Sequence, residues 1–274
     1  MSPVANTSHT AGPYEIYPFH DGIFRTSSQN LMHAGGDAPR LAAIEKWGGG
    51  ELFMVVNCFA LSGPDGVILV DTGSGDEEGP ENGLASQALR DAGFFPESVR
   101  HVLLTHIHSD HLGGLFDGDR ARYPEAIVHV PAGDLDFYVE EPGGTPSFKA
   151  KSIRNIGRLR ALYGDRVSPL GAGQTLPGIE TIPLPGHTPG HCGFLIGQGS
   201  DALLIWGDVI HVQDLQISDP QIGMVYDIDT AKALQTRMGI MHKAAREGWR
   251  VAGSHLNGIH RIREQGAGFA FIDP

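Results

Sequence analysis

Apolar and polar residues alternate along several short segments of the chain, a pattern typical of strands with one buried face. The first segment begins at Tyr14 and ends near Arg25. Residues 52–61 and 67–70 follow, and the Ser-Gly-Pro-Asp-Gly turn between them predicts a hairpin. Further short apolar runs predict strands at 102–104, 126–130, 179–183, 192–196, 202–206, 251–252 and 268–272.

Three other segments have the 3.6-residue spacing of amphipathic helices. They cover residues 84–92, residues 149–163 and a segment from Asp229 or Thr230 to about Glu247, where the polar residue at the start can cap the helix. The basic residues of the second helix are interpreted as a solvated face. Strands in pairs with helices between them predict an α/β fold, with residues 14–274 forming a single domain.

Two segments have no clear period. Residues 1–13 are small and polar, which predicts a flexible N-terminal tail. Residues 30–50 are rich in glycine and predict a long loop with a short helix near 41–47. Long loops in compact domains are often functional. The loop carries Met32 and Trp47, which we expect either to line an apolar substrate pocket or simply to pack on the fold.

Composition limits the compartment and the partners. The 274 residues are 41% hydrophobic and carry a formal net charge of -12, which repels phosphate backbones and argues against a nucleic-acid partner. No apolar run approaches the roughly 18 residues of a membrane span. Cys58 and Cys192 are too few for a disulfide framework, and the N-terminus has no signal-like pattern. We therefore expect buried thiols and a cytoplasmic protein.

The 14 histidines are unevenly distributed, and the densest group follows the apolar run 102–104. The segment reads Thr-His-Ile-His-Ser-Asp-His. Residues two apart in an extended segment point to the same side, so His106 and His108 can hold one ion together. Asp110 and His111 come where the strand has ended and can face a second ion. Nitrogen and carboxylate ligands without cysteine favour zinc or a similar ion.

Three later motifs complete a known pattern. They are Gly-His-Thr-Pro-Gly-His at 186–191, Trp-Gly-Asp at 206–208 and Gly-Ser-His at 253–255. Together with the first cluster, they resemble the metallo-β-lactamase superfamily. The resemblance implies a four-layer αββα sandwich and two divalent metal ions, with zinc expected.

The resemblance also implies a role for each matched residue. One ion is held by His106, His108 and His187, the other by Asp110, His111 and His255, and Asp208 bridges both. Asp71, in a Val-Asp-Thr-Gly segment, orients a ligand imidazole. His191 is expected to support the site or to pack rather than to bind metal. His211 stands where many lactonases of the superfamily have a tyrosine, and either contacts the substrate carbonyl or has no special role.

The expected chemistry follows from this ligand set. A bridging carboxylate and two cations lower the pKa of a shared water, which gives a hydroxide nucleophile at neutral pH. Asp110 then relays a proton to the leaving oxygen. The segments 207–213, 219–220, 227–229 and 254–269 resemble the methyl parathion hydrolase-like branch, whereas 30–50 and 131–170 do not.

We therefore predict a metal-dependent hydrolase of a lactone or ester that acts on a small molecule. Two alternatives remain open: a phosphotriesterase and a non-catalytic metal- or ligand-binding sensor. A homodimer is expected from base rates and from the family likeness alone.

Overall fold

The structure is a computed structural model that describes residues 8–141 and 143–273. The chain divides into two compact units. Unit 1 comprises Met1–Gly22 and Val56–Gly171, and unit 2 comprises Ile23–Val55 and Ala172–Pro274. Two long strands, β2 (Tyr14–Ser27) and β4 (Glu51–Gly63), pass from one unit into the other, so the chain crosses the boundary inside regular structure.

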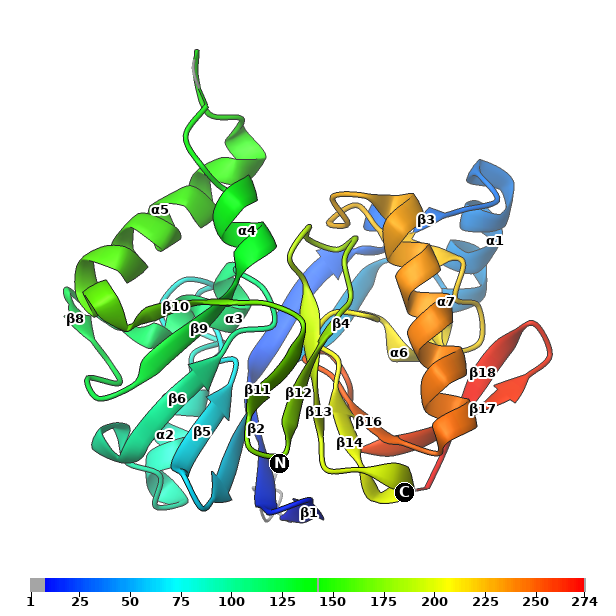
Figure 1. Ribbon diagram of the computed structural model, residues 1–274. Helices are drawn as coiled ribbons and strands as arrows, with labels where there is room; N and C mark the ends of the chain where they lie inside the picture. The colour runs from blue at the N-terminus through cyan, green and yellow to red at the C-terminus, as the bar shows by residue number, and fades with distance from the viewer. Residues whose placement is uncertain (1–7, 142, 274) are drawn as a thin grey trace. The chain divides into compact units, whose positions relative to one another are not determined.

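Unit 1 is built on a seven-stranded sheet with the order β1-β2-β4-β5-β6-β9-β10 (Figure 1). The strands not yet given are β1 (His9–Ala11), β5 (Gly66–Val70), β6 (Val99–Leu103), β9 (Ile127–Pro131) and β10 (Val167–Leu170). The hairpin predicted between residues 52–61 and 67–70 is β4 and β5. From β5 to β10 neighbouring strands are parallel. Residues 68–70 of β5 are apolar and fully buried, which is typical of a parallel strand covered on both faces.

Helices of unit 1 follow these strands. They are α2 (Ala85–Asp91), α3 (Ser109–Leu112), α4 (Ala132–Phe137) and α5 (Ser147–Tyr163). Leu89 of α2 and Ile156 and Leu159 of α5 lie in the apolar core of the sheet, so the predicted helical spacing is confirmed. A small hairpin of β7 (Phe116–Asp117) and β8 (Arg120–Ala121) lies in the same unit.

The basic face of α5 is solvated only in part, and that interpretation is wrong for Lys149. Lys149 is buried and its Nζ lies 2.6 Å from Glu141. Lys151 pairs with Glu78, and Arg158 pairs with Glu77. Glu77 and Glu78 are distant in sequence from the helix, so its local charge pattern does not reveal these pairs.

Unit 2 holds the second seven-stranded sheet, in the order β11-β12-β13-β14-β16-β17-β18. The strands are β11 (Gly173–Leu176), β12 (Ile179–Pro183), β13 (Cys192–Ile196), β14 (Leu203–Ile205), β16 (Arg250–Ala252), β17 (His260–Gln265) and β18 (Gly268–Ile272). Helix α7 (Thr230–Glu247) covers this sheet and buries Ile240 and Met241. The side chain of Asp229 accepts a hydrogen bond from Lys232 N, so the predicted cap is confirmed.

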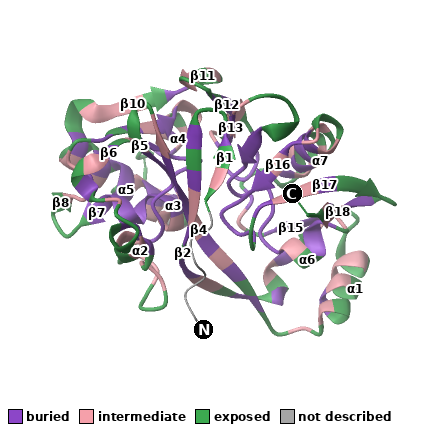
Figure 2. Cartoon of the chain, turned by 90° about the horizontal axis from the view of Figure 1, so that it is seen from below, coloured by how far each residue is buried: buried purple, intermediate pink, exposed green. Residues whose placement is uncertain are grey.

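The segment 30–50 is largely regular, so the predicted long loop is wrong, whereas the short helix predicted near 41–47 is confirmed as the C-terminal part of a longer helix. The segment contains β3 (Leu31–His33), paired with β15 (Ile222–Met224), and α1 (Asp37–Trp47). Only Ile44 of α1 is buried, and Figure 2 shows the rest of this helix as intermediate or exposed. A helix with so narrow an apolar stripe leaves little periodic signal in the sequence.

The remaining short elements are α6 (Gln213–Gln216) and the 3-10 helices η1 (Ser28–Asn30), η2 (Pro96–Ser98), η3 (Gly113–Leu115), η4 (Gly164–Arg166) and η5 (Gly199–Asp201). The flexible tail predicted for residues 1–13 is wrong for β1, which pairs with β2; residues 1–7 lie outside the described residues. Cys58 and Cys192 form no disulfide and are buried, as predicted. Among the described residues, no helix is both long and apolar enough to span a membrane.

Candidate metal centre

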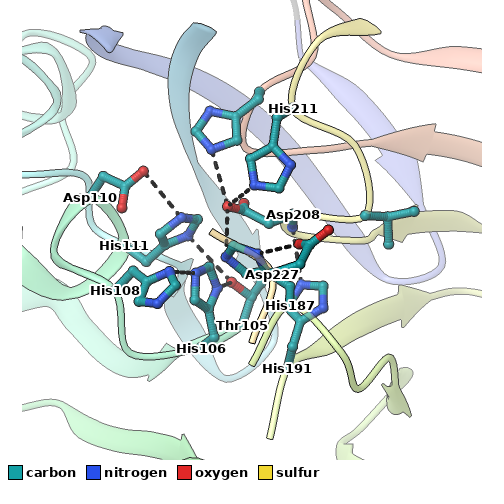
Figure 3. Close-up of polar contacts among 12 residues, drawn as sticks. Thr105, His106, His108, Asp110, His111, His187, His191, Asp208, His211 and Asp227 are labelled. Atoms are coloured by element: carbon teal, nitrogen blue, oxygen red, sulfur yellow. Dashed lines mark hydrogen bonds and ion pairs between the residues drawn. The ribbon is translucent and has the colours of Figure 1, made fainter. Parts of the chain in front are cut away.

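In unit 1, the histidine-rich motif begins just after β6 and ends in the single turn α3. His106 Nε2 and His108 Nδ1 are 3.1 Å apart, so these two imidazoles converge as the extended spacing predicts (Figure 3). Helix α3 carries the other two candidates, and Asp110 Oδ2 lies 3.4 Å from His111 Nε2. The four side chains predicted to bind metal from this unit therefore form one group.

Asp71 contacts this group directly. Its Oδ2 lies 2.8 Å from His111 Nδ1, and its two oxygens accept hydrogen bonds from the backbone and hydroxyl of Thr105. Among the described residues it is the only non-glycine residue with positive φ, at 54°. Such backbone strain is found where a surrounding network imposes it, often at functional sites. The contact is the one required by the orienting role predicted for Asp71.

Two further contacts around the motif were not predicted. Tyr138 Oη lies 3.3 Å from His108 Nε2, and Asp134 Oδ2 accepts a hydrogen bond from Ile107 N at 3.2 Å. Burial, reinforced by Asp134, raises the pKa of the Tyr138 phenol. Both residues lie in the segment 131–170, where the sequence shows no likeness to the family branch, so no motif indicated them.

In unit 2, three imidazoles surround one carboxylate oxygen. Asp208 Oδ2 lies 3.3 Å from His211 Nε2 and 3.4 Å from His187 Nε2 (Figure 3). The same oxygen lies 3.1 Å from His255 Nε2. All four side chains are buried. His211 therefore lies with the candidate ligands of this unit. Burial lowers the pKa of His211, while the contact with Asp208 opposes that shift.

Behind His187 stands a carboxylate that the sequence reading missed. Asp227 Oδ1 lies 3.0 Å from His187 Nδ1, and Asp227 Oδ2 lies 3.5 Å from Arg237 Nη2. Burial alone would raise the pKa of Asp227. The hydrogen bond donated by His187 and the positive charge of Arg237 are among the interactions that outweigh burial and lower this pKa to about 2. Asp227 stands in one of the segments that resemble the family branch. Neither its residue type nor its distance along the chain from other residues predicts a role for it.

His191 supports the loop that carries Asp208. Its Nδ1 donates to Leu184 O at 2.8 Å, and its Nε2 accepts a hydrogen bond from the backbone N–H of Asp208 at 3.0 Å. Both ring nitrogens therefore serve backbone groups. This arrangement favours the supporting role predicted for His191 over a ligand role.

The hydrogen-bond partners of the imidazoles provide a test of whether the groups suit a cation. His111, His187 and His255 each direct Nδ1 to an obligate acceptor, which is Asp71, Asp227 and the carbonyl of Val55 respectively. Each Nδ1 must then carry the proton, so a neutral ring directs the lone pair of Nε2 toward a carboxylate oxygen. Lone pairs of nitrogen and oxygen repel one another unless a cation is shared between them. The donor set therefore fits divalent metal, and zinc suits its nitrogen and oxygen atoms.

The family of the chain follows from a comparison of its sequence with those of known families. Residues 52–255 match the sequence model of the metallo-beta-lactamase superfamily. The chain belongs to this superfamily. The matched span takes in all seven predicted ligands and draws on both units.

The chain matches individual curated proteins at low sequence identity and over only part of their length. A probable metallo-hydrolase of Mycobacterium tuberculosis is 27% identical over 172 residues, which cover 54% of this chain and 54% of the relative. An N-acyl homoserine lactonase of a Bacillus species is 27% identical over 167 residues, which cover 54% of this chain and 60% of the relative. The chain thus spans little more than half the length of the curated relatives it matches.

Solved structures match along the whole chain. The hydrolase AbOPH of the beta lactamase superfamily gives a TM-score of 0.85 at 25% identity, with 100% of this chain and 99% of that chain covered. AidC, a dizinc quorum-quenching lactonase, gives 0.83 at 22% identity, with 98% and 97% covered. The predicted α/β fold of the metallo-β-lactamase type is confirmed. The predicted class, a metal-dependent hydrolase with lactonase-like relatives, agrees with the names of these proteins.

Proposed function

We propose that the protein is a dinuclear metal-dependent hydrolase that cleaves a lactone or an ester. The observation that carries the proposal is the set of imidazoles whose Nδ1 atoms face obligate acceptors, so that their Nε2 lone pairs face carboxylates. The proposed ligands of one ion are His106, His108 and His187, those of the other are Asp110, His111 and His255, and Asp208 serves both. We propose zinc for both positions.

Bound divalent ions would supply a water of lowered pKa and an electrophile for the substrate's carbonyl oxygen. The residues of the chain prepare and complete that chemistry. Asp71 and Asp227 hold two imidazoles in one tautomer and one orientation. Asp110, only partly buried, carries a proton to the leaving oxygen. His211 has no hydrogen-bond partner for its Nδ1 among the described residues, and we propose that this atom contacts the substrate.

A lactone is the first substrate to test, because curated relatives are named N-acyl homoserine lactonases. We propose that Met32, which is 41% exposed, and Trp47 provide apolar contacts for the acyl part. The family match draws on both units, which supports residues 14–274 acting as one hydrolase domain. A homodimer remains a proposal based on family likeness.

The test is turnover by purified, zinc-loaded protein on an N-acyl homoserine lactone, an aryl ester and a phosphotriester. We expect the lactone or the ester to be cleaved and Asp208→Ala to abolish the cleavage. Turnover of the phosphotriester alone would replace the proposed reaction by the phosphotriesterase alternative. No turnover on any of the three by protein with its metal bound would favour the sensor alternative.

A further inference from the structure

The phenol of Tyr138 faces the side of His108 that is turned away from the other ligands. Tyr138 Oη lies 3.3 Å from His108 Nε2, while His108 Nδ1 lies 3.1 Å from His106 Nε2. The two nitrogens of one imidazole therefore have different neighbours. Which nitrogen carries the proton decides whether His108 can offer a lone pair beside His106.

The position of the proton on His108 decides whether this ring can bind an ion beside His106. His106 Nδ1 lies 3.1 Å from the hydroxyl of Thr105, which itself donates to Asp71. His106 Nδ1 therefore donates to that hydroxyl, and His106 Nε2 keeps its lone pair. If His108 carried its proton on Nδ1, it would donate that proton to His106 Nε2. The lone pairs of both rings would then be unavailable to an ion.

We propose that Tyr138 is a positioning residue that accepts a hydrogen bond from His108 Nε2–H and so directs the lone pair of His108 Nδ1 toward a metal ion. The inference rests on the proposed function, because it assigns a residue to the metal site of that function. Tyr138 acts through His108 and touches neither substrate nor metal.

The surroundings of Tyr138 hold its ring in place. Tyr138 follows α4 directly, is almost fully buried, and donates its backbone N–H to Asp134 O at 3.0 Å. Asp134 in turn accepts from the backbone of Ile107, inside the histidine motif. The hydroxyl of Tyr138 also hydrogen-bonds the side chain of Ser152 on α5. This bond lowers the pKa of the phenol, as a bond donated to the phenol oxygen does, and the same oxygen has a second lone pair that can accept from His108.

The other oriented imidazoles of the site use a different kind of partner. His111 and His187 face carboxylates, and His255 faces a backbone carbonyl. A phenol can both donate and accept, so Tyr138 alone does not force a tautomer as a carboxylate does. Ser152 assists the accepting role of Tyr138, because it donates to the same phenol oxygen and holds that oxygen beside His108 Nε2.

The test compares Tyr138→Phe with Tyr123→Phe. Tyr123 is equally buried in the same unit, and its hydroxyl has no hydrogen-bond partner among the described residues. Two measurements apply to each protein. Zinc affinity is measured by competition with a chelator, and the tautomer of His108 in metal-free protein is measured by NMR of ¹⁵N-labelled histidine.

We expect Tyr138→Phe to weaken zinc binding at one of the two positions by about 10- to 100-fold, as is typical of losing an outer partner of a ligand. It should also move the proton of His108 from Nε2 to Nδ1, which a merely structural role would not do. Tyr123→Phe should leave both the zinc affinity and the tautomer of His108 unchanged. Ser152→Ala keeps the ring in place and should weaken zinc binding by a smaller factor, so the inference can be tested even if Tyr138→Phe folds poorly.

Unchanged zinc affinity and an unchanged tautomer in Tyr138→Phe would overturn the inference while leaving the proposed function intact. Equal losses in Tyr138→Phe and Tyr123→Phe would also overturn it, because the effect would then come from the core and not from His108. Failure of the unsubstituted protein to bind zinc would instead overturn the proposed function, and this inference with it.

Discussion

Arg237 and Asp227 form a buried ion pair behind His187, with 3.5 Å between Arg237 Nη2 and Asp227 Oδ2. Arg237 also donates to the carbonyls of Val209, Pro220 and Ile222. The arginine thus joins α7 to the loops that follow Asp208. The carboxylate it fixes is the one that orients His187. The side chain of Arg237 therefore links the packing of α7 to the orientation of His187.

The first prediction concerns Asp227→Asn. The amide keeps the size of the carboxylate but can turn its NH₂ toward His187 Nδ1, and it leaves the charge of Arg237 unpaired. We expect zinc affinity to fall by about 10- to 100-fold and thermal stability to fall as well. Asp229→Asn is the matched control, because asparagine caps a helix as well as aspartate does. Normal zinc affinity in Asp227→Asn would show that His187 needs no anionic partner.

The second prediction concerns metal content. The seven candidate ligands of the proposed function lead us to expect two equivalents of metal per chain. Elemental analysis of protein purified without chelator, then dialysed against zinc, measures this number. A reproducible value of one in fully active protein would contradict the dinuclear proposal.

The third prediction concerns Asp208→Ala. Asp208 Oδ2 is near three imidazoles, so the loss of this carboxylate should release one ion and reduce kcat/KM far more than tenfold. Asp214→Ala removes an exposed carboxylate from the neighbouring helix α6 and should change neither quantity. Activity of Asp208→Ala within about tenfold of the unsubstituted protein, or roughly 1.4 kcal/mol in barrier, would show that Asp208 does not bridge.

The fourth prediction concerns pH and lies away from the metal ligands. His101 Nδ1 and His129 Nε2 are 3.0 Å apart on β6 and β9. Burial, then the charge of His101, lowers the pKa of His129 from its usual 6.5 to about 4. The unfolded chain therefore binds a proton between these values that the folded chain does not, so stability falls as pH drops from about 6.5 toward 4.

His129→Gln should make the melting temperature less sensitive to pH over that range. His242→Gln serves as control, since His242 is exposed and pairs with Glu264. An identical pH dependence in His129→Gln and the unsubstituted protein would show that His129 does not titrate in this window.

Elements with local patterns could be predicted from the sequence. The strands at 179–183, 192–196 and 268–272 and the helix α7 have the predicted bounds, because periodicity and caps are properties of neighbouring residues. The pairing of β3 with β15 could not be predicted. It joins Leu31 to Met224, and nothing in either short segment specifies a partner so far along the chain.

The same limit applies to the candidate site. The candidate ligands stand in compact motifs, and within each unit the structure brings their side chains close together. Only one of the groups that orient the imidazoles could be predicted from the sequence. Asp71 follows a recognisable strand, but the carbonyl of Val55 has no signature because every residue carries one. Tyr138 and Asp227 are ordinary residue types whose role appears only when the fold brings them to a histidine.

The fifth prediction concerns the segment that carries Met32 and Trp47. Trp47 is partly buried against a cluster that includes Leu31, Leu52 and Leu215, whereas Met32 is 41% exposed. Trp47→Ala should lower the melting temperature, because apolar packing is lost. Met32→Ala has little packing to lose and should leave the melting temperature unchanged.

If Met32 and Trp47 contact the acyl part of the substrate, both variants should lower kcat/KM for a long-chain ester more than for a short-chain one. Metal content should not change. Equal losses for both esters in Met32→Ala, or no loss at all, would show that this segment only packs on unit 2 and that the acyl part binds elsewhere.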